Sequence, residues 1–163
     1  MRRDFIIKLT SFALAALLLG FVGYAGAQDK PADNMQILRD KIKADKKLLV
    51  AANMDLTESE AKSFWPVYDQ YQKDLQKINQ RVAKVIESYA EDYRNHSLTD
   101  EKARKLIDEA LAIDKAEADL KSAYGPKLAG AVSAKKALRY LQIENKIRAV
   151  VRYDVASGVP LVR

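Results

Sequence analysis

Apolar residues in the middle of the chain recur at alternating intervals of three and four positions. The members of this run are Ala61, Phe64, Tyr68, Tyr71, Leu75, Ile78, Val82, Val85 and Tyr89. This spacing places every member on one face of a helix, and roughly four repeats of it are typical of a long helix packed against partner helices. The pattern therefore predicts one long helix over residues 58–94.

Weaker apolar patterns on either side of this run predict three further helices. The first is expected over residues 34–53, with a buried stripe of Met35, Leu38, Ile42, Leu49 and Ala52. The third follows a hairpin at residues 95–98 and is capped by Thr99. Gly125-Pro126 is expected to interrupt it, because proline lacks the amide hydrogen that a helix needs.

The fourth helix is expected from Ser133 to about Asp154, followed by an apolar tail over residues 157–163 that could dock on the helices. No segment shows the alternation of a strand. The expected fold class is therefore all-α, an elongated antiparallel four-helix arrangement with a long central α-hairpin. The domain divisions are a helical domain over residues 34–156, preceded by a disordered tail over residues 28–33.

The start of the long helix carries a clear capping signal. In Thr57-Glu58-Ser59-Glu60, the threonine hydroxyl can accept from the backbone of Glu60, whose carboxylate can reach back to the threonine amide. Leu56 stands at the position before the cap, where an apolar residue often packs on the first turns. Pro66, two turns further on, is expected to kink the helix.

The fourth helix has apolar residues on two sides. Tyr140, Ile143, Ile147 and Val151 form one face, and Leu138 and Leu141 lie nearly opposite. A helix of this kind is buried twice or contacts a second subunit or a ligand. Between the faces runs a polar stripe of Lys135, Arg139, Gln142 and Lys146. The stripe is either a solvated edge or the rim of a protein-binding surface, and we take its members as candidate binding residues.

Trp65 is a further candidate, because it lies beside the apolar seam and next to Pro66. It either plugs the end of the helical assembly or faces a client or a partner subunit. The tyrosines at positions 68, 71, 89 and 93 have helical spacing, which favours core packing over an aromatic binding strip. Glu117 falls where the third helix expects an apolar residue, so we expect it to pair with a lysine or arginine at the edge of the core.

Residues 1–27 have the pattern of an export signal. Three basic residues precede an apolar stretch from about residue 12 to residue 22, and the small residues at 25–27 form a cleavage site. Such a segment is too short for a stable transmembrane helix. We expect cleavage before Gln28, a periplasmic location and no stable membrane insertion afterwards. The Sec route is preferred to the twin-arginine route that Arg2-Arg3 resembles.

Composition narrows the function classes. The chain has 163 residues, a formal charge of +6 and no cysteine. Loss of residues 1–27, which carry three basic residues and one acidic residue, would leave 136 residues with a charge of +4, the size of one domain. This charge is too small for the dense basic stripes of nucleic-acid binding. Without cysteine there is neither a disulfide framework nor a thiolate metal site.

Two helix starts together suggest a family. Leu56-Thr57-Glu58-Ser59-Glu60 opens the long helix, and Val132-Ser133-Ala134-Lys135-Lys136 opens the last one. A Leu-Thr-x-x-Gln motif at these two places is the hallmark of the periplasmic Spy/CpxP family, which this chain resembles as a divergent member. Glu60 preserves the capping chemistry of the motif, whereas Lys136 offers no acceptor and loses the reciprocal bond.

The resemblance implies a stress-related periplasmic protein that works without ATP. Members of that family are similar in forming a cradle-shaped helical dimer that holds partly unfolded clients on an apolar and basic surface, and some modulate a stress sensor. The implied partners are unfolded or partner envelope proteins and a second copy of the chain. No cofactor and no enzymatic activity are implied.

A second hypothesis is a four-helix bundle that carries a haem or a metal between its helices. The candidate ligands are Met35, Met54 and the only histidine, His96, which falls in the expected hairpin. Hydrolysis or group transfer is a third hypothesis with less support. The chain has no Gly-x-Ser-x-Gly sequence and no cysteine nucleophile, and one loop histidine is a poor general base.

Overall fold

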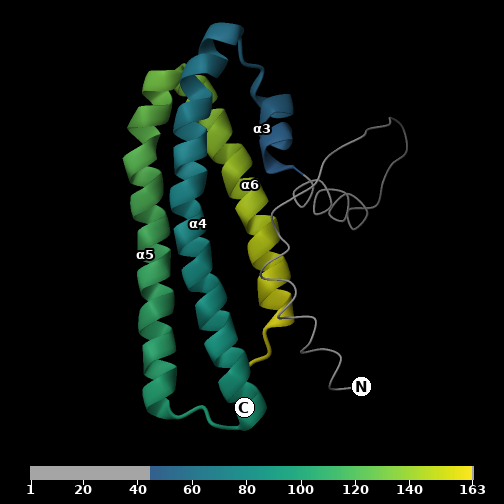
Figure 1. The fold of residues 1–163 in the computed structure, drawn as a ribbon, viewed down its shortest axis with the longest axis vertical. Coiled ribbons are helices and arrows are strands. Elements are labelled where there is room, and N and C mark those ends of the chain that lie inside the picture. Colours follow the sequence, from purple (N-terminus) through teal and green to yellow (C-terminus); the bar gives the residue numbers. More distant parts are fainter. Residues whose placement is uncertain (1–44, 163) are drawn as a thin grey trace, which may run out of the picture. The chain divides into compact units, whose positions relative to one another are not determined.

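The computed structural model describes residues 45–162, which form four helices and no strand (Figure 1). These are α3 (Lys46–Met54), α4 (Glu58–Asn95), α5 (Asp100–Ala131) and α6 (Ala134–Gly158). The all-α expectation is confirmed. The export signal over residues 1–27, the tail over residues 28–33 and the apolar stripe from Met35 to Ile42 lie outside the described residues.

The described residues fall into two compact units. One unit holds α4, α5, the first turn of α6 through Ala137, and the tail from Val159. The other holds α3 and the remainder of α6, from Leu138 to Gly158. We call them the hairpin unit and the α3–α6 unit, and we describe each separately.

Helix α4 confirms the long helix expected from the heptad pattern. Its observed span, Glu58–Asn95, ends one residue beyond the expected limit. Five members of the seam are buried, namely Phe64, Tyr68, Tyr71, Leu75 and Ile78. The later members Val82, Val85 and Tyr89 are half-buried. Pro66 lies inside the helix, which continues through it.

Helix α5 lies beside α4 and runs back along it from the turn (Figure 1). The expected interruption at Gly125-Pro126 is wrong, because α5 continues through both residues to Ala131. The clash that normally keeps the residue before proline out of a helix involves its Cβ atom, and Gly125 has none. The flanking residues Tyr124 and Leu128 are buried, and their packing further favours the helix.

The turn between α4 and α5 follows the sequence, whereas α6 runs to Gly158, beyond its expected end near Asp154 and into the expected tail. His96 adopts a left-handed conformation (φ 51°) at the end of α4, and the Thr99 hydroxyl accepts from the Lys102 amide at the start of α5. The apolar tail returns to α4, where the Tyr89 hydroxyl donates to the Pro160 carbonyl at 2.8 Å. The expected docking of the tail is therefore confirmed at this residue.

Helix α3 is shorter than the expected first helix. Asp45 is extended (φ −158°, ψ 98°), so one continuous helix over residues 34–53 is wrong at this position. The reason is a local cap, since the Asp45 side chain accepts from the Leu48 amide at 3.0 Å and thereby starts a new helix at Lys46.

Both ends of α3 are tied to α6 within the α3–α6 unit. The Lys46 ammonium lies 2.7 Å from an oxygen of Glu144, whose side chain is fully buried. Burial lowers the pKa of Lys46, while the Glu144 carboxylate acts in the opposite direction. At the other end, the Arg139 Nε donates to the Asn53 carbonyl at 2.5 Å. The pair of contacts fixes the register of α3 on α6.

The buried stripe of α6 differs from the expected one. Its members are Ala137, Tyr140, Glu144, Ile147 and Val150. Intervals of four, three and three residues after Tyr140 average less than one helical turn, so the buried stripe rotates around the helix toward its end. Val151 is consequently 37% exposed and Leu138 is 56% exposed, so burial on two sides is wrong at these residues, while the alternative of contact with a second subunit or a ligand stays a prediction.

Candidate protein-binding surface

The cap at the start of α4 has the geometry that the sequence predicts. The Thr57 hydroxyl accepts from the Glu60 amide at 3.2 Å, and the Glu60 carboxylate accepts from the Thr57 amide at 2.9 Å. This reciprocal pair satisfies two amide groups that the first turn leaves without helical partners. Leu56, before the cap, is half-buried.

The second motif forms only one of the two hydrogen bonds of a capping box, and the side chain of its last residue makes an ion pair instead. The Ser133 hydroxyl accepts from the Lys136 amide at 3.2 Å, and Val132 is buried. The Lys136 ammonium does not fold back on its own helix but lies 2.5 Å from a carboxylate oxygen of Glu60. This ion pair and the Thr57 amide hold the pKa of Glu60 below its ordinary value. Lys136 thus links the starts of α4 and α6.

The polar stripe predicted on α6 is exposed throughout, at Lys135, Arg139, Gln142 and Lys146. Arg139 has a structural role, because its guanidinium satisfies a carbonyl in the last turn of α3. Reversal of its charge would therefore weaken the attachment of α3 as well as any binding. Lys135 belongs to the hairpin unit and the other three members to the α3–α6 unit.

Trp65 packs at the edge of the aromatic core of α4. Its ring makes edge contacts with Phe64 and Tyr68, at centroid distances of 5.0 and 5.3 Å, and its side chain is half-buried. These contacts favour the packing interpretation over the client-facing one. Glu117, which stands at an apolar position of the α5 stripe, is 6% exposed, and its pairing with a lysine or arginine stays a prediction.

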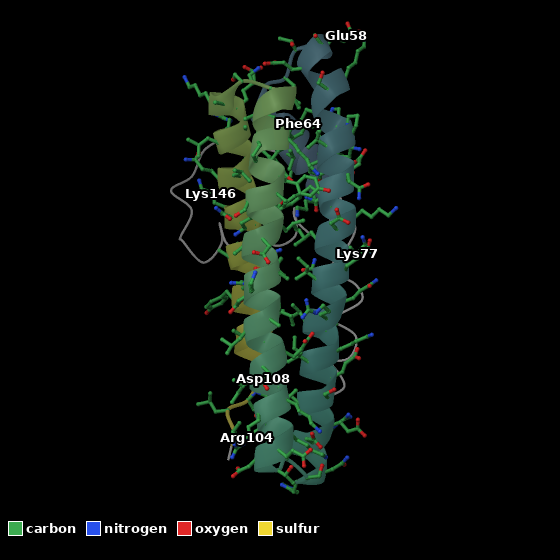
Figure 2. The ribbon with its side chains drawn as sticks, turned by 90° about the vertical axis from the view of Figure 1, so that its left-hand side faces the viewer. Glu58, Phe64, Lys77, Arg104, Asp108 and Lys146 are labelled. Carbon is green, nitrogen blue, oxygen red and sulfur yellow. The ribbon has the colours of Figure 1, made fainter. Side chains whose placement is uncertain are left out.

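A groove that the sequence analysis missed lies between α4 and α5, toward the turn of the hairpin. It encloses about 360 Å³. In Figure 2 the labelled Arg104 and Asp108 mark this end of the hairpin. The lining of the groove comes from two helices: Arg81, Lys84, Val85, Ser88 and Asp92 on α4, and Lys102, Lys105, Leu106 and Glu109 on α5. We call this set the hairpin groove.

Two ion pairs between the helices bound the hairpin groove. Away from the turn, Arg81 donates to both carboxylate oxygens of Glu109, at 2.8 and 3.1 Å. Near the turn, the Lys102 ammonium lies 2.5 Å from Asp92, which also accepts from the Ser97 hydroxyl at 2.7 Å. The cations hold the pKa values of Glu109 and Asp92 below their ordinary range. Both carboxylates therefore stay ionised at neutral pH.

Between these ion pairs the lining of the hairpin groove combines two apolar residues with two lysines. Val85 and Leu106 are half-buried, whereas Lys84, Ser88 and Lys105 are exposed. A sequence signal for this arrangement existed, since opposite charges stand near the turn on both helices at Asp92 and Lys102. Their pairing across the hairpin could only be read once the register of the two helices was known.

The described residues offer no group of three or more metal-binding side chains. His96 is exposed at the end of α4, and Met54 is fully buried at the end of α3. Met35, the remaining ligand of the haem or metal hypothesis, lies outside the described residues.

Within residues 45–162, no helix is both long enough and apolar enough to span a bilayer. No family model, curated protein or solved structure matches the chain. The function is therefore inferred from the site alone.

Proposed function

We propose that this is a stress-related periplasmic protein that binds unfolded or partner proteins on an apolar and basic helical surface without ATP. It acts either as a chaperone or as the modulator of a sensor. The observation that carries the proposal is the hairpin groove, whose lining brings together the apolar residues Val85 and Leu106 and cations of two helices.

Such a surface suits proteins as ligands. Apolar side chains of a client gain free energy when they leave water, and charge attraction speeds the encounter while leaving the bound segment free to exchange. Further apolar side chains stand exposed on the same hairpin, at Ile107 (57%) and Leu111 (64%), and enlarge the surface that a client could contact. The capping motifs of α4 and α6 and the pattern of residues 1–27 support the periplasmic part of the proposal.

The test is suppression of aggregation by the purified chain that begins at Gln28. A chemically denatured client is diluted into buffer with a several-fold molar excess of the protein and no ATP, and light scattering is recorded. We expect reduced scattering with the protein and none of this effect with the same mass of an unrelated helical protein. Unchanged scattering for several clients would refute the chaperone form, and fractionation of cells would test the location separately.

A paired charge reversal tests whether the α6 stripe takes part in binding. Lys135→Glu with Lys146→Glu changes exposed residues of the stripe and spares Arg139, whose contact with α3 is structural. If this variant suppresses aggregation as well as the unchanged protein, the stripe is a solvated edge. If suppression is lost while helicity is retained, the stripe belongs to the binding surface.

A further inference from the structure

The cations of the hairpin groove are not equally engaged. At its two ends, Arg81 and Lys102 each hold a carboxylate of the opposite helix. These pairs neutralise the ends and fix the spacing of α4 and α5 there. The centre of the groove keeps the two remaining cations of its lining, Lys84 and Lys105.

The central lysines have weak partners or none. Lys84 makes no ion pair within the described residues. Lys105 pairs with Glu101 at 2.7 Å, but the two side chains are 74% and 79% exposed. Exposed pairs of this kind contribute little and exchange readily, so a second carboxylate can compete for Lys105. The lining as a whole carries four cations and two carboxylates, and the excess positive charge lies at the centre.

The apolar part of the lining adds a second requirement. Val85 and Leu106 line the groove, each directly after a central lysine in the sequence, and both are half-buried. A ligand that satisfied the lysines alone would leave this apolar surface in water. The matching ligand therefore carries carboxylates and apolar side chains together.

The length of the groove suits a short segment of polypeptide. From Arg81 to Asp92, α4 advances about 16 Å at its rise of ~1.5 Å per residue. That distance accommodates about three turns of helix or about five extended residues. A lipid bilayer fits less well, because apolar residues that insert into a membrane must project from the surface, and Val85 and Leu106 are half-buried.

We infer that the hairpin groove binds an acidic, apolar segment of a partner protein, with the carboxylates of that segment at Lys84 and Lys105 and its apolar side chains on Val85 and Leu106. This inference rests on the proposed function and names the class of partner that the function would serve. It predicts discrimination by charge, which a purely apolar client surface would not show.

The test measures the binding of labelled peptides by fluorescence anisotropy. The probe is a fluorescein-labelled peptide of about twelve residues, long enough for three helical turns, in which glutamate, leucine and serine alternate. A second peptide carries lysine in place of glutamate, and vesicles of phosphatidylglycerol represent an anionic membrane. All are offered to the chain that begins at Gln28, at low and at high salt.

The decisive variant is Lys84→Glu with Lys105→Glu. Its matched control is Lys73→Glu with Lys115→Glu, which makes the same charge change on the same two helices outside the groove. Lys115 forms an exposed pair with Asp119, four residues away, as Lys105 does with Glu101. All four lysines are exposed, so we expect both variants to keep the circular dichroism of the unchanged protein. If either does not, the corresponding glutamine variants replace it.

We expect the acidic peptide to bind the unchanged protein and the control, and to bind the groove variant about tenfold more weakly. Binding should weaken as salt rises, because the lysines are exposed. Leu106→Ser should also reduce the affinity, at unchanged helicity. The inference is overturned if the acidic peptide does not bind, if both paired variants weaken it equally, if the lysine peptide binds as tightly, or if only the vesicles bind.

The same variants in the aggregation assay separate this inference from the function on which it rests. If the unchanged protein suppresses aggregation but the acidic peptide fails to bind at the groove, the proposed function stands and the named partner class is wrong. If the acidic peptide binds at the groove and no client is protected, the chaperone form is wrong and the groove remains a specific docking site.

Discussion

The two halves of the α4–α5 hairpin are held together by different contacts. Away from the turn, apolar residues are buried on both helices: Phe64, Tyr68, Tyr71, Leu75 and Ile78 on α4, and Ile113, Tyr124 and Leu128 on α5. We call this the core half. From residue 79 to residue 112, around the turn, no residue is buried, and ion pairs join the helices. We call this the turn half.

The difference separates stability from recognition along one pair of helices. Buried apolar surface contributes most of the free energy of folding, whereas exposed ion pairs contribute little. The turn half can therefore keep apolar residues half-exposed and cations available, because the core half holds the helices together. We expect the two halves to respond differently to the same kind of change.

The largest expected effect comes from a charge in the core half. Leu75 is 3% exposed, so Leu75→Asp would bury an unpaired carboxylate and should lower the free energy of unfolding by more than about 4 kcal/mol. Chemical denaturation followed by circular dichroism measures this. The matched change Leu111→Asp, at a residue 64% exposed, should stay within about 0.5 kcal/mol. Equal effects would show that the two halves do not differ in this way.

A smaller effect is expected from the polar contact inside the core half. The Tyr124 hydroxyl donates to the Asp74 carboxylate at 2.6 Å, beside the edge contact of its ring with Tyr71. Tyr124→Phe should cost about 1 kcal/mol, the usual net contribution of such a bond. A double-mutant cycle with Asp74→Asn would show whether the two residues are coupled. Additive losses would mean that the hydrogen bond contributes nothing.

The same contact predicts a response to alkaline pH. Burial, together with Asp74, raises the pKa of Tyr124 to about 12. Because the neutral form is favoured in the folded protein, this stabilisation is fully present below about pH 10, the ordinary tyrosine pKa, and is lost as the pH rises toward 12. Ultraviolet titration should show one tyrosine that ionises late, and that late step should be missing in Tyr124→Phe. An unaltered titration curve in the variant would assign the late ionisation to another tyrosine.

Two threonine caps test whether the halves unfold together. Thr57 caps α4 at the core half with a reciprocal pair of bonds, and Thr99 caps α5 at the turn half with one. We expect Thr57→Ala to cost about 1–2 kcal/mol and Thr99→Ala about 0.5 kcal/mol. Hydrogen exchange should show the Thr99 change mainly in amides near the turn. Equal losses of amide protection throughout the hairpin would indicate that it unfolds as one cooperative unit.

The smallest effect is expected from acid at the turn half. The pKa values of Asp92 and Glu109 are lowered, mainly by Lys102 and Arg81 respectively. Their stabilisation is therefore present above about pH 4, the ordinary carboxyl pKa, and is lost as the pH falls through the lowered values. Carboxyl chemical shifts followed by nuclear magnetic resonance should report this. In a variant with Arg81→Gln and Lys102→Gln, both carboxyl groups should titrate closer to their ordinary values.

The sequence determined the long helix and the starts of the three longest helices of this protein. The heptad run predicted α4, and the threonine and serine caps predicted where α4, α5 and α6 begin. Local hydrogen bonds and helical periodicity decide these features, so they are legible in a short stretch of chain. The sequence misplaced the break at Gly125-Pro126, because burial of the flanking residues outweighs the weak local preference there.

Only the tertiary structure decided which charges meet. Lys136 with Glu60, Arg81 with Glu109 and Lys46 with Glu144 join residues from 28 to 98 positions apart. Such pairs depend on the register of one helix against another, which the packing of whole helices sets and no short pattern encodes. The hairpin groove exists for the same reason, since its walls come from two helices and its charge depends on which cations are already engaged.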